Sequence, residues 1–132
     1  MRTLFLLFFS AVLSIPAAER PVPPPGVMVA ANDKVDLEAG LTRLSTSIEK
    51  IKGNLLAPDV IIFRDAVRYA FTYNEFFKPE EVARGKDLLR QGQERADALA
   101  KGQAPWTTAT GLVVRGYRSQ IDDSVQPYGL VV

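Results

Sequence analysis

The feature that most constrains this 132-residue chain is its last stretch, GLVVRGYRSQIDDSVQPYGLVV, at residues 111–132. The pattern predicts two extended segments joined by a turn at Asp122-Asp123-Ser124. The first segment carries apolar residues on both faces, which is typical of a strand inside a covered sheet. A lone two-stranded hairpin is marginally stable in water, so we expect it to need helices or further strands. No turn or polar tail follows Leu130-Val131-Val132, and we therefore expect the chain to be the front part of a longer protein.

The register of the hairpin is left open by the sequence. A two-residue turn would place Tyr117 opposite Tyr128, whereas a three-residue loop would place Ile121 opposite Val125. Pro127 has no N–H to donate, so it belongs at an edge or at a position outside the ladder of hydrogen bonds.

Three helices are predicted ahead of the hairpin, at residues 36–52, 59–74 and 79–100. The first shows apolar residues at spacings of 4, 3, 4 and 3 and has Asp33 as a capping residue. The third begins with a proline and two acids and closes at Gly102, which suits a left-handed cap. The apolar stripes of these two helices are Leu37, Leu41, Leu44, Ile48 and Ile51, and Val82, Gly85, Leu89, Gly92, Ala96 and Leu99. The predicted fold class is α+β, with about three helices followed by a β-hairpin.

The second helix differs from the other two because it is apolar around most of its circumference. Such a helix is normally buried on more than one side. Two interpretations remain open: part of its surface faces protein outside this chain, or a tightly wrapped bundle leaves only Tyr69 and Tyr73 pointing outward.

The N-terminus has the layout of a secretory signal peptide. Arg2 precedes an apolar run at residues 4–15, and Pro16-Ala17-Ala18 supplies small residues before a charged pair. We expect export and cleavage near Ala18, because the run falls short of the roughly 20 apolar residues of a spanning helix. The alternative is an uncleaved membrane anchor. A proline-rich linker is predicted to follow at residues 19–32.

Composition excludes several function classes. Cleavage after Ala18 removes Arg2 and no acid, which leaves Lys and Arg equal in number to Asp and Glu. A nucleic-acid binder needs a basic face to neutralise phosphates, so no nucleic-acid partner is predicted. The chain has no His and no Cys, so it cannot assemble a Ser-His-Asp triad, a Cys-His dyad or a His-containing zinc site.

Three groups of residues are candidates for a functional site. Glu80-Glu81 are adjacent on a helix and do not face each other, which disfavours a catalytic acid pair. The acids of the Asp122-Asp123-Ser124 turn are ordinary turn residues, so calcium binding is not predicted. Trp106 either anchors the connector on the helices or stacks on a ligand. We therefore assign no catalytic, cofactor-binding or metal residue in this chain, and no cofactor.

Two stretches carry a resemblance, LAPDVIIFRDAVRYAFTYNEFFKPEEV at residues 56–82 and APWTTATGLVVRGYRSQIDDSVQPYGLVV at residues 104–132. Together they resemble the region ahead of the catalytic domain in exported bacterial α/β-hydrolases, the prolyl-oligopeptidase-like peptidases and esterases of planctomycetes and related bacteria. The matching segments are residues 73–77, 105–107, 111–117 and 126–128. The turn of that family is usually Asp-Gly-Ser, where this chain has Asp122-Asp123-Ser124.

The resemblance implies that the hairpin begins an α/β-hydrolase sheet and that a Gly-x-Ser-x-Gly nucleophile elbow, an Asp and a His follow in the longer protein. The expected organisation is a signal peptide (1–18), a linker (19–32), a helical region (33–102), and a connector with hairpin that starts a truncated catalytic domain (103–132). The chain alone would be inactive, and its partner would be the catalytic domain beyond Val132. A self-sufficient exported protein-binding module, with the aromatic helix or a strand edge as contact surface, is the alternative.

Overall fold

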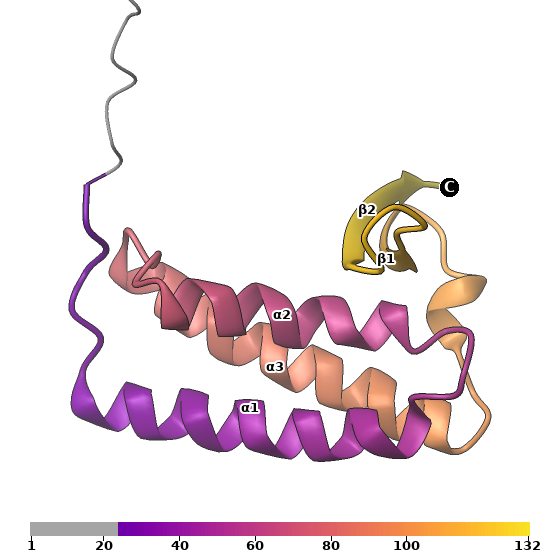
Figure 1. Cartoon of the computed structure of the whole chain (residues 1–132), viewed down its shortest axis with the longest axis horizontal. Helices are drawn as coiled ribbons and strands as arrows, with labels where there is room; N and C mark the ends of the chain where they lie inside the picture. The colour runs from indigo at the N-terminus through magenta and orange to yellow at the C-terminus, as the bar shows by residue number, and fades with distance from the viewer. Residues whose placement is uncertain (1–23) are drawn as a thin grey trace, which may run out of the picture.

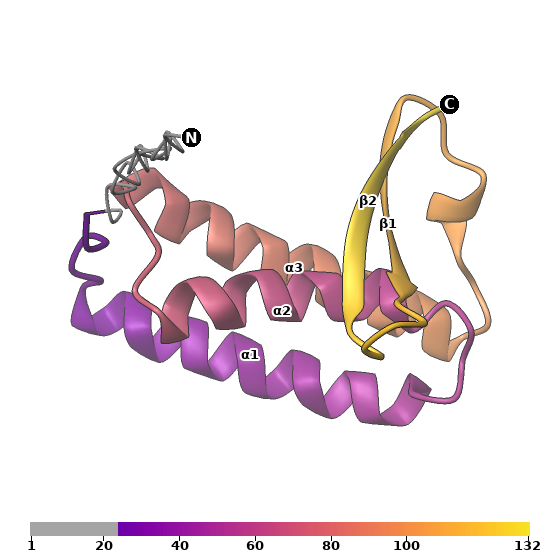
Figure 2. The same cartoon turned by 45° about the horizontal axis from the view of Figure 1, so that its top comes forward.

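The structure is a computed structural model and describes residues 24–132. The predicted signal peptide, residues 1–18, lies outside this range. Three helices lie side by side, and a hairpin crosses one end of the second (Figures 1 and 2). The elements are α1 (Ala31–Ile51), α2 (Pro58–Thr72), α3 (Pro79–Ala100), the 3-10 turn η1 (Pro105–Thr107), β1 (Leu112–Arg118) and β2 (Val125–Val131). The predicted α+β class, three helices followed by a two-stranded antiparallel sheet, is confirmed.

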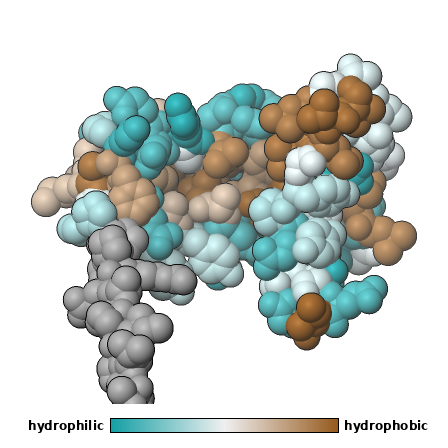
Figure 3. All heavy atoms as spheres, turned by 90° about the horizontal axis from the view of Figure 1, so that it is seen from above, coloured by the Kyte–Doolittle hydropathy of each residue, from teal (hydrophilic) through white to brown (hydrophobic). Residues whose placement is uncertain are grey.

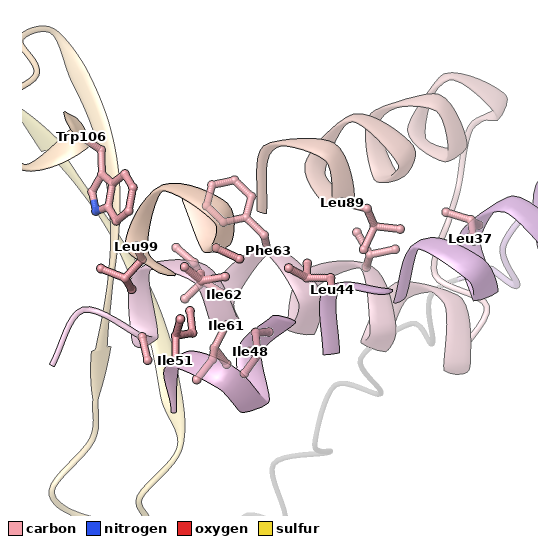
Figure 4. Close-up of a cluster of buried hydrophobic side chains, with 14 of the residues drawn as sticks. Leu37, Leu44, Ile48, Ile51, Ile61, Ile62, Phe63, Leu89, Leu99 and Trp106 are labelled. Carbon is pink, nitrogen blue, oxygen red and sulfur yellow. The ribbon is translucent and has the colours of Figure 1, made fainter. Parts of the chain in front are cut away.

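The core lies where the apolar stripes of α1 and α3 meet the buried side of α2 (Figure 4). Every stripe position of α3 is buried, and so is every stripe position of α1 except the partly buried Leu41. Gly92 allows the close approach of these helices. A Cβ on this residue would lie 2.7 Å from Leu44 Cδ2 and 2.8 Å from Phe63 Cβ. The glycines of α3 are therefore packing positions, as their place in the apolar stripe suggests.

The start of α1 differs from the prediction. The helix begins at Ala31 with Ala30 as N-cap, and no side chain caps it. Asp33 lies inside the first turn, where its carboxylate pairs with Lys86 of α3 at 2.7 Å instead of capping the helix. The N–H groups of Gly26 and Val27 donate to the carbonyls of residues 74 and 76 at 3.0 and 2.6 Å. The predicted linker is thus anchored from Gly26 onward and ends before residue 31.

The prediction that α2 is buried on more than one side is confirmed, because it contacts α1, α3 and both strands. The hairpin within the chain covers the first half of α2, a contact that the sequence did not predict. Tyr69 and Tyr73, at the other end of the helix, are 47% and 65% exposed and stack with ring centroids 6.2 Å apart. None of the helices between residues 24 and 132 combines the length and apolarity needed to cross a bilayer.

Both predicted hairpin registers are wrong. The structure pairs Tyr117 with Gln126 and Arg118 with Val125, so residues 119–124 form a six-residue loop. Inside the loop, the N–H of Ser119 donates to the carbonyl of Ser124 at 2.8 Å, and Asp123 has φ 60°. The longer loop places Pro127 opposite Gly116.

Candidate functional site

The buried charged side chain of the described chain is Asp59, in the first turn of α2. Pro58 begins the helix and lacks an N–H, so the first turn costs no unmade hydrogen bond there. The Asp59 side chain is 1% exposed. Its Oδ2 accepts from Trp106 Nε1 at 2.9 Å and from Arg115 Nε at 2.8 Å, and its Oδ1 accepts from the N–H of Gly116 at 2.7 Å. One buried carboxylate therefore joins the helical layer to η1 and β1.

Arg95 of α3 supplies a second link to the hairpin. Its Nη1 donates to the carbonyls of Asp59 at 3.1 Å and Val114 at 2.9 Å. Its guanidinium lies 4.7 Å from the ring centroid of Phe63 and 5.0 Å from that of Trp106, within the range of cation–π attraction. Burial lowers the pKa of Arg95, which the negative charge of Asp59 opposes and the positive charge of Arg115 reinforces. The group stays charged because an arginine pKa lies far above neutrality.

Asp59 and Arg95 together occupy the outer edge of β1. Mutual hydrogen bonds join Gly111 to Val132, so in the antiparallel ladder the residues at alternate positions, including Val114 and Gly116, turn their backbone groups outward. Arg95 donates to the outward carbonyl of Val114, and Asp59 accepts from the outward N–H of Gly116. The edge of β1 is therefore blocked against strand addition.

The same alternation leaves the outer edge of β2 open. Its outward positions are Val125, Pro127, Gly129 and Val131, by the register with β1. No backbone hydrogen bond within the described chain reaches these outward groups from another element. Pro127 removes one donor from this edge, as expected for a proline outside the ladder.

Gly116 brings the strand against the helix. A Cβ on this residue would lie 2.2 Å from the carbonyl oxygen of Pro58 and 2.9 Å from Ile62 Cγ2. A side chain at this position would push β1 away from α2 and stretch the bond between Asp59 and the Gly116 N–H. The sequence offers no periodicity that marks this glycine, since its partner lies 57 residues earlier.

A cavity of about 350 Å³ lies between α2, α3, η1 and the hairpin. Its walls are mainly apolar, and Arg95 is the charged residue that lines it. The lining residues are Ile62, Phe63, Ala66, Leu88, Gln91, Arg95, Trp106, Ala109, Thr110, Leu112, Val113, Val114 and Pro127.

The hairpin exposes apolar side chains on both faces. Tyr117, Tyr128 and Leu130 share one face and are 50%, 39% and 40% exposed, and the two tyrosine rings meet edge to face at 5.9 Å. Leu112 and Val131, on the other face, are 75% and 88% exposed. Hydrophobic residues accordingly gather at the hairpin end of the molecule (Figure 3). Apolar surface gathered in this way is typical of an interaction site.

The residues weighed as sites from the sequence have structural roles in the fold. Glu81 accepts the N–H of Phe77 at 2.7 Å, which satisfies a backbone donor just ahead of α3. Asp122 accepts from Ser124 Oγ at 2.7 Å. Hydrogen bonds from the side chains of Ser124 and Ser119 lower the pKa of Asp122. Asp123 instead accepts from Arg118 at 3.2 Å. No group of acids with metal-binding geometry occurs among residues 24–132.

Trp106 anchors the connector, as one of the two sequence interpretations proposed. This residue is 7% exposed, and its indole N–H is satisfied by Asp59. Sequence reasoning missed Arg95 and the partnership of Asp59 with Arg115. The signals available were an acid after a helix-starting proline and a lone tryptophan that needs an acceptor when buried. The arrangement holds elements together and presents a surface; it contains no nucleophile with a neighbouring base.

Comparisons with known proteins leave the family open, because no family model, no curated protein and no solved structure matches this chain.

Proposed function

We propose that this chain is the non-catalytic N-terminal segment of an exported serine hydrolase, a prolyl-oligopeptidase-like peptidase or esterase, and that it is inactive alone. Its role is to present the hairpin as the first two strands of a larger sheet. The three helices would pack beside the catalytic domain. The motifs at residues 73–77, 105–107, 111–117 and 126–128 suggest the family.

The observation that carries the proposal is the difference between the two edges of the hairpin. Asp59 and Arg95 block the outer edge of β1, whereas the outer edge of β2 is open. Apolar residues on both faces of the pair favour a covered sheet over a solvated one. An open edge of this kind pairs readily with another strand, so the larger sheet would extend from β2.

The first test is to read the gene past the codon for Val132. We expect an open frame that carries Gly-x-Ser-x-Gly followed by an Asp and a His. The long product should hydrolyse p-nitrophenyl butyrate or a proline-containing p-nitroanilide, whereas the chain that ends at Val132 should not. Replacing the serine of the elbow by alanine in the long product is the matched control and should abolish turnover. A stop codon directly after Val132, or a continuation without the elbow, would overturn the proposal.

Export is tested separately by sequencing the N-terminus of the mature protein. Cleavage near Ala18 predicts a first residue at or near Glu19 in the periplasm or the medium. Retention of Met1 in the membrane fraction would contradict cleavage and would support the uncleaved anchor.

The alternative function is a self-sufficient exported protein-binding module. The stacked, exposed pair of Tyr69 and Tyr73 is the observation that favours it, because aromatic residues are enriched at protein interfaces. A stop codon after Val132, together with a chain that unfolds cooperatively as a monomer, would support this alternative against the hydrolase.

A further inference from the structure

We propose that the cavity between α2, α3, η1 and the hairpin binds a monocarboxylate with an apolar chain, and that Arg95 holds the carboxylate. This site shares Pro127 with the open edge of β2, and it does not depend on whether the chain belongs to a hydrolase. The volume of about 350 Å³ falls at the lower end of the roughly 300–1,000 Å³ of small-molecule pockets.

The hydrogen-bonding capacity of Arg95 is only partly used within the described residues. Its Nη1 is used by the carbonyls of Asp59 and Val114. Its Nε and Nη2 make no hydrogen bond to any residue from 24 to 132. These two nitrogens form one edge of the planar guanidinium, and such an edge matches the two oxygens of a carboxylate.

The positive charge of Arg95 is the second feature of the site. Arg95 and Arg115 flank a single buried acid, Asp59, whose oxygens are already used by Arg115, Trp106 and Gly116. No salt bridge pairs Arg95 with an acid in the described part of the chain. The neighbouring Glu94 is engaged with Arg90 instead. The site therefore carries one uncompensated positive charge, which a monoanion would neutralise.

The walls of the cavity are the third feature of the site. The rings of Phe63 and Trp106 lie close to the guanidinium. Beyond the cation the cavity is lined by Ile62, Leu112 and Val113, which would contact an alkyl chain. An apolar tail with a single acidic end fits this lining better than a polar or multiply charged ligand.

The test uses the mature chain and titrates octanoate while following the emission of Trp106. This residue is the only tryptophan in the chain and lines the cavity, so its fluorescence reports occupancy. We expect saturable binding of octanoate, with 1-octanol weaker by about 10-fold or more, because the alcohol lacks the charged hydrogen bonds. Equal affinities for octanoate and 1-octanol, or no saturable signal by fluorescence and calorimetry, would overturn the proposal.

Two variants, Arg95→Met and Ala66→Phe, locate the site, and Arg84→Met is their control. Arg95→Met should weaken the binding of octanoate by about 10-fold or more. Arg84 is an exposed residue of the same helix, so Arg84→Met should bind octanoate as the parent does. Arg95→Met also removes the contacts to β1 and needs circular dichroism to show that it folds. Ala66→Phe leaves Arg95 in place and fills the cavity from α2, so it should abolish binding. Unchanged binding by a folded Ala66→Phe protein would place octanoate elsewhere and reject the site.

Discussion

The carboxylate of Asp59 shows how much of this fold depends on a single side chain. It accepts hydrogen bonds from three groups on η1 and β1 and is almost fully buried. In water each of those donors would be solvated, so the cluster is stable only if all its members are present together. Removing the acceptor leaves Arg115 and the N–H groups of Trp106 and Gly116 without this partner in a largely buried site.

We predict that Asp59→Ala destabilises the protein by about 3–5 kcal/mol, the usual cost of leaving one member of a buried ion pair alone. Chemical denaturation followed by circular dichroism measures this loss. Glu49→Ala is the matched control, since Glu49 forms a pair with Lys52 in which both side chains are about 70% exposed, and exposed pairs contribute little. Similar stabilities for the two variants would mean that the Asp59 cluster does not hold the hairpin in place.

At the scale of elements, the helices touch where side chains are smallest. Gly40 of α1 and Gly92 of α3 both lie under large residues of a neighbouring helix, Leu89 in the first case and Leu44 in the second. The close approach of α1 and α3 thus depends on these two glycines as well as on the larger side chains that pack against them.

The expected effect of Gly92→Ala follows from that contact. Helix propensity favours alanine by about 1 kcal/mol, whereas overpacking a filled interior costs about 1–3 kcal/mol, and sometimes more. Because the new Cβ would meet two atoms closer than 3.0 Å, we predict a net loss of stability. The melting temperature should fall relative to the parent.

Gly53→Ala provides the comparison for this substitution. Nothing lies within 4 Å of a Cβ at Gly53, so the stability of the Gly53→Ala protein should stay within about 0.5 kcal/mol of that of the parent. A stabilised Gly92→Ala protein would show that α1 and α3 can move apart at little cost.

Helix positions and the core could be predicted because the spacing of apolar residues carries that information locally. The range predicted for α3 matches the observed one, and α2 differs by one or two residues at its ends. The start of α1 was missed because Asp33 has two competing partners, the helix N-terminus and Lys86, and the second is 53 residues away. The hairpin register was missed for a related reason, since a six-residue loop has no two-residue turn signal to fix it.

The Asp59 cluster was not predicted because its partners are joined by tertiary contacts across 47 to 57 residues. Nothing in the local pattern around Asp59 distinguishes it from an ordinary acid in a first turn. The function predicted from the sequence stays a proposal, since it depends on a resemblance and the geometry supplies only the open edge.

At the scale of the whole molecule, the hairpin end is unlike the rest of the surface. It combines a blocked edge, an open edge and apolar side chains on both faces. Exposed edges of this kind are prone to pair with other chains. Isolated copies of this chain should therefore associate through β2.

We predict that Val131→Lys lowers this self-association. The lysine would place a charge on the open strand at a position that is 88% exposed, so folding should be little affected. Sedimentation velocity over a wide range of concentrations measures the effect. Leu55→Lys is the control, because Leu55 is 95% exposed in the turn between α1 and α2. A parent chain that stays monomeric at every concentration would contradict the prediction.

The long separation between Asp59 and its partners has a consequence for the order of assembly during synthesis. The chain is made from its N-terminus, so α1, α2 and α3 are synthesised before Trp106, Arg115 and Gly116. Until β1 is made, the Asp59 carboxylate must remain hydrated, and Ile62 cannot be covered by the strand. The side of α2 that faces the hairpin therefore stays uncovered at this stage. Its burial is completed when Gly116 and the rest of β1 pack against it.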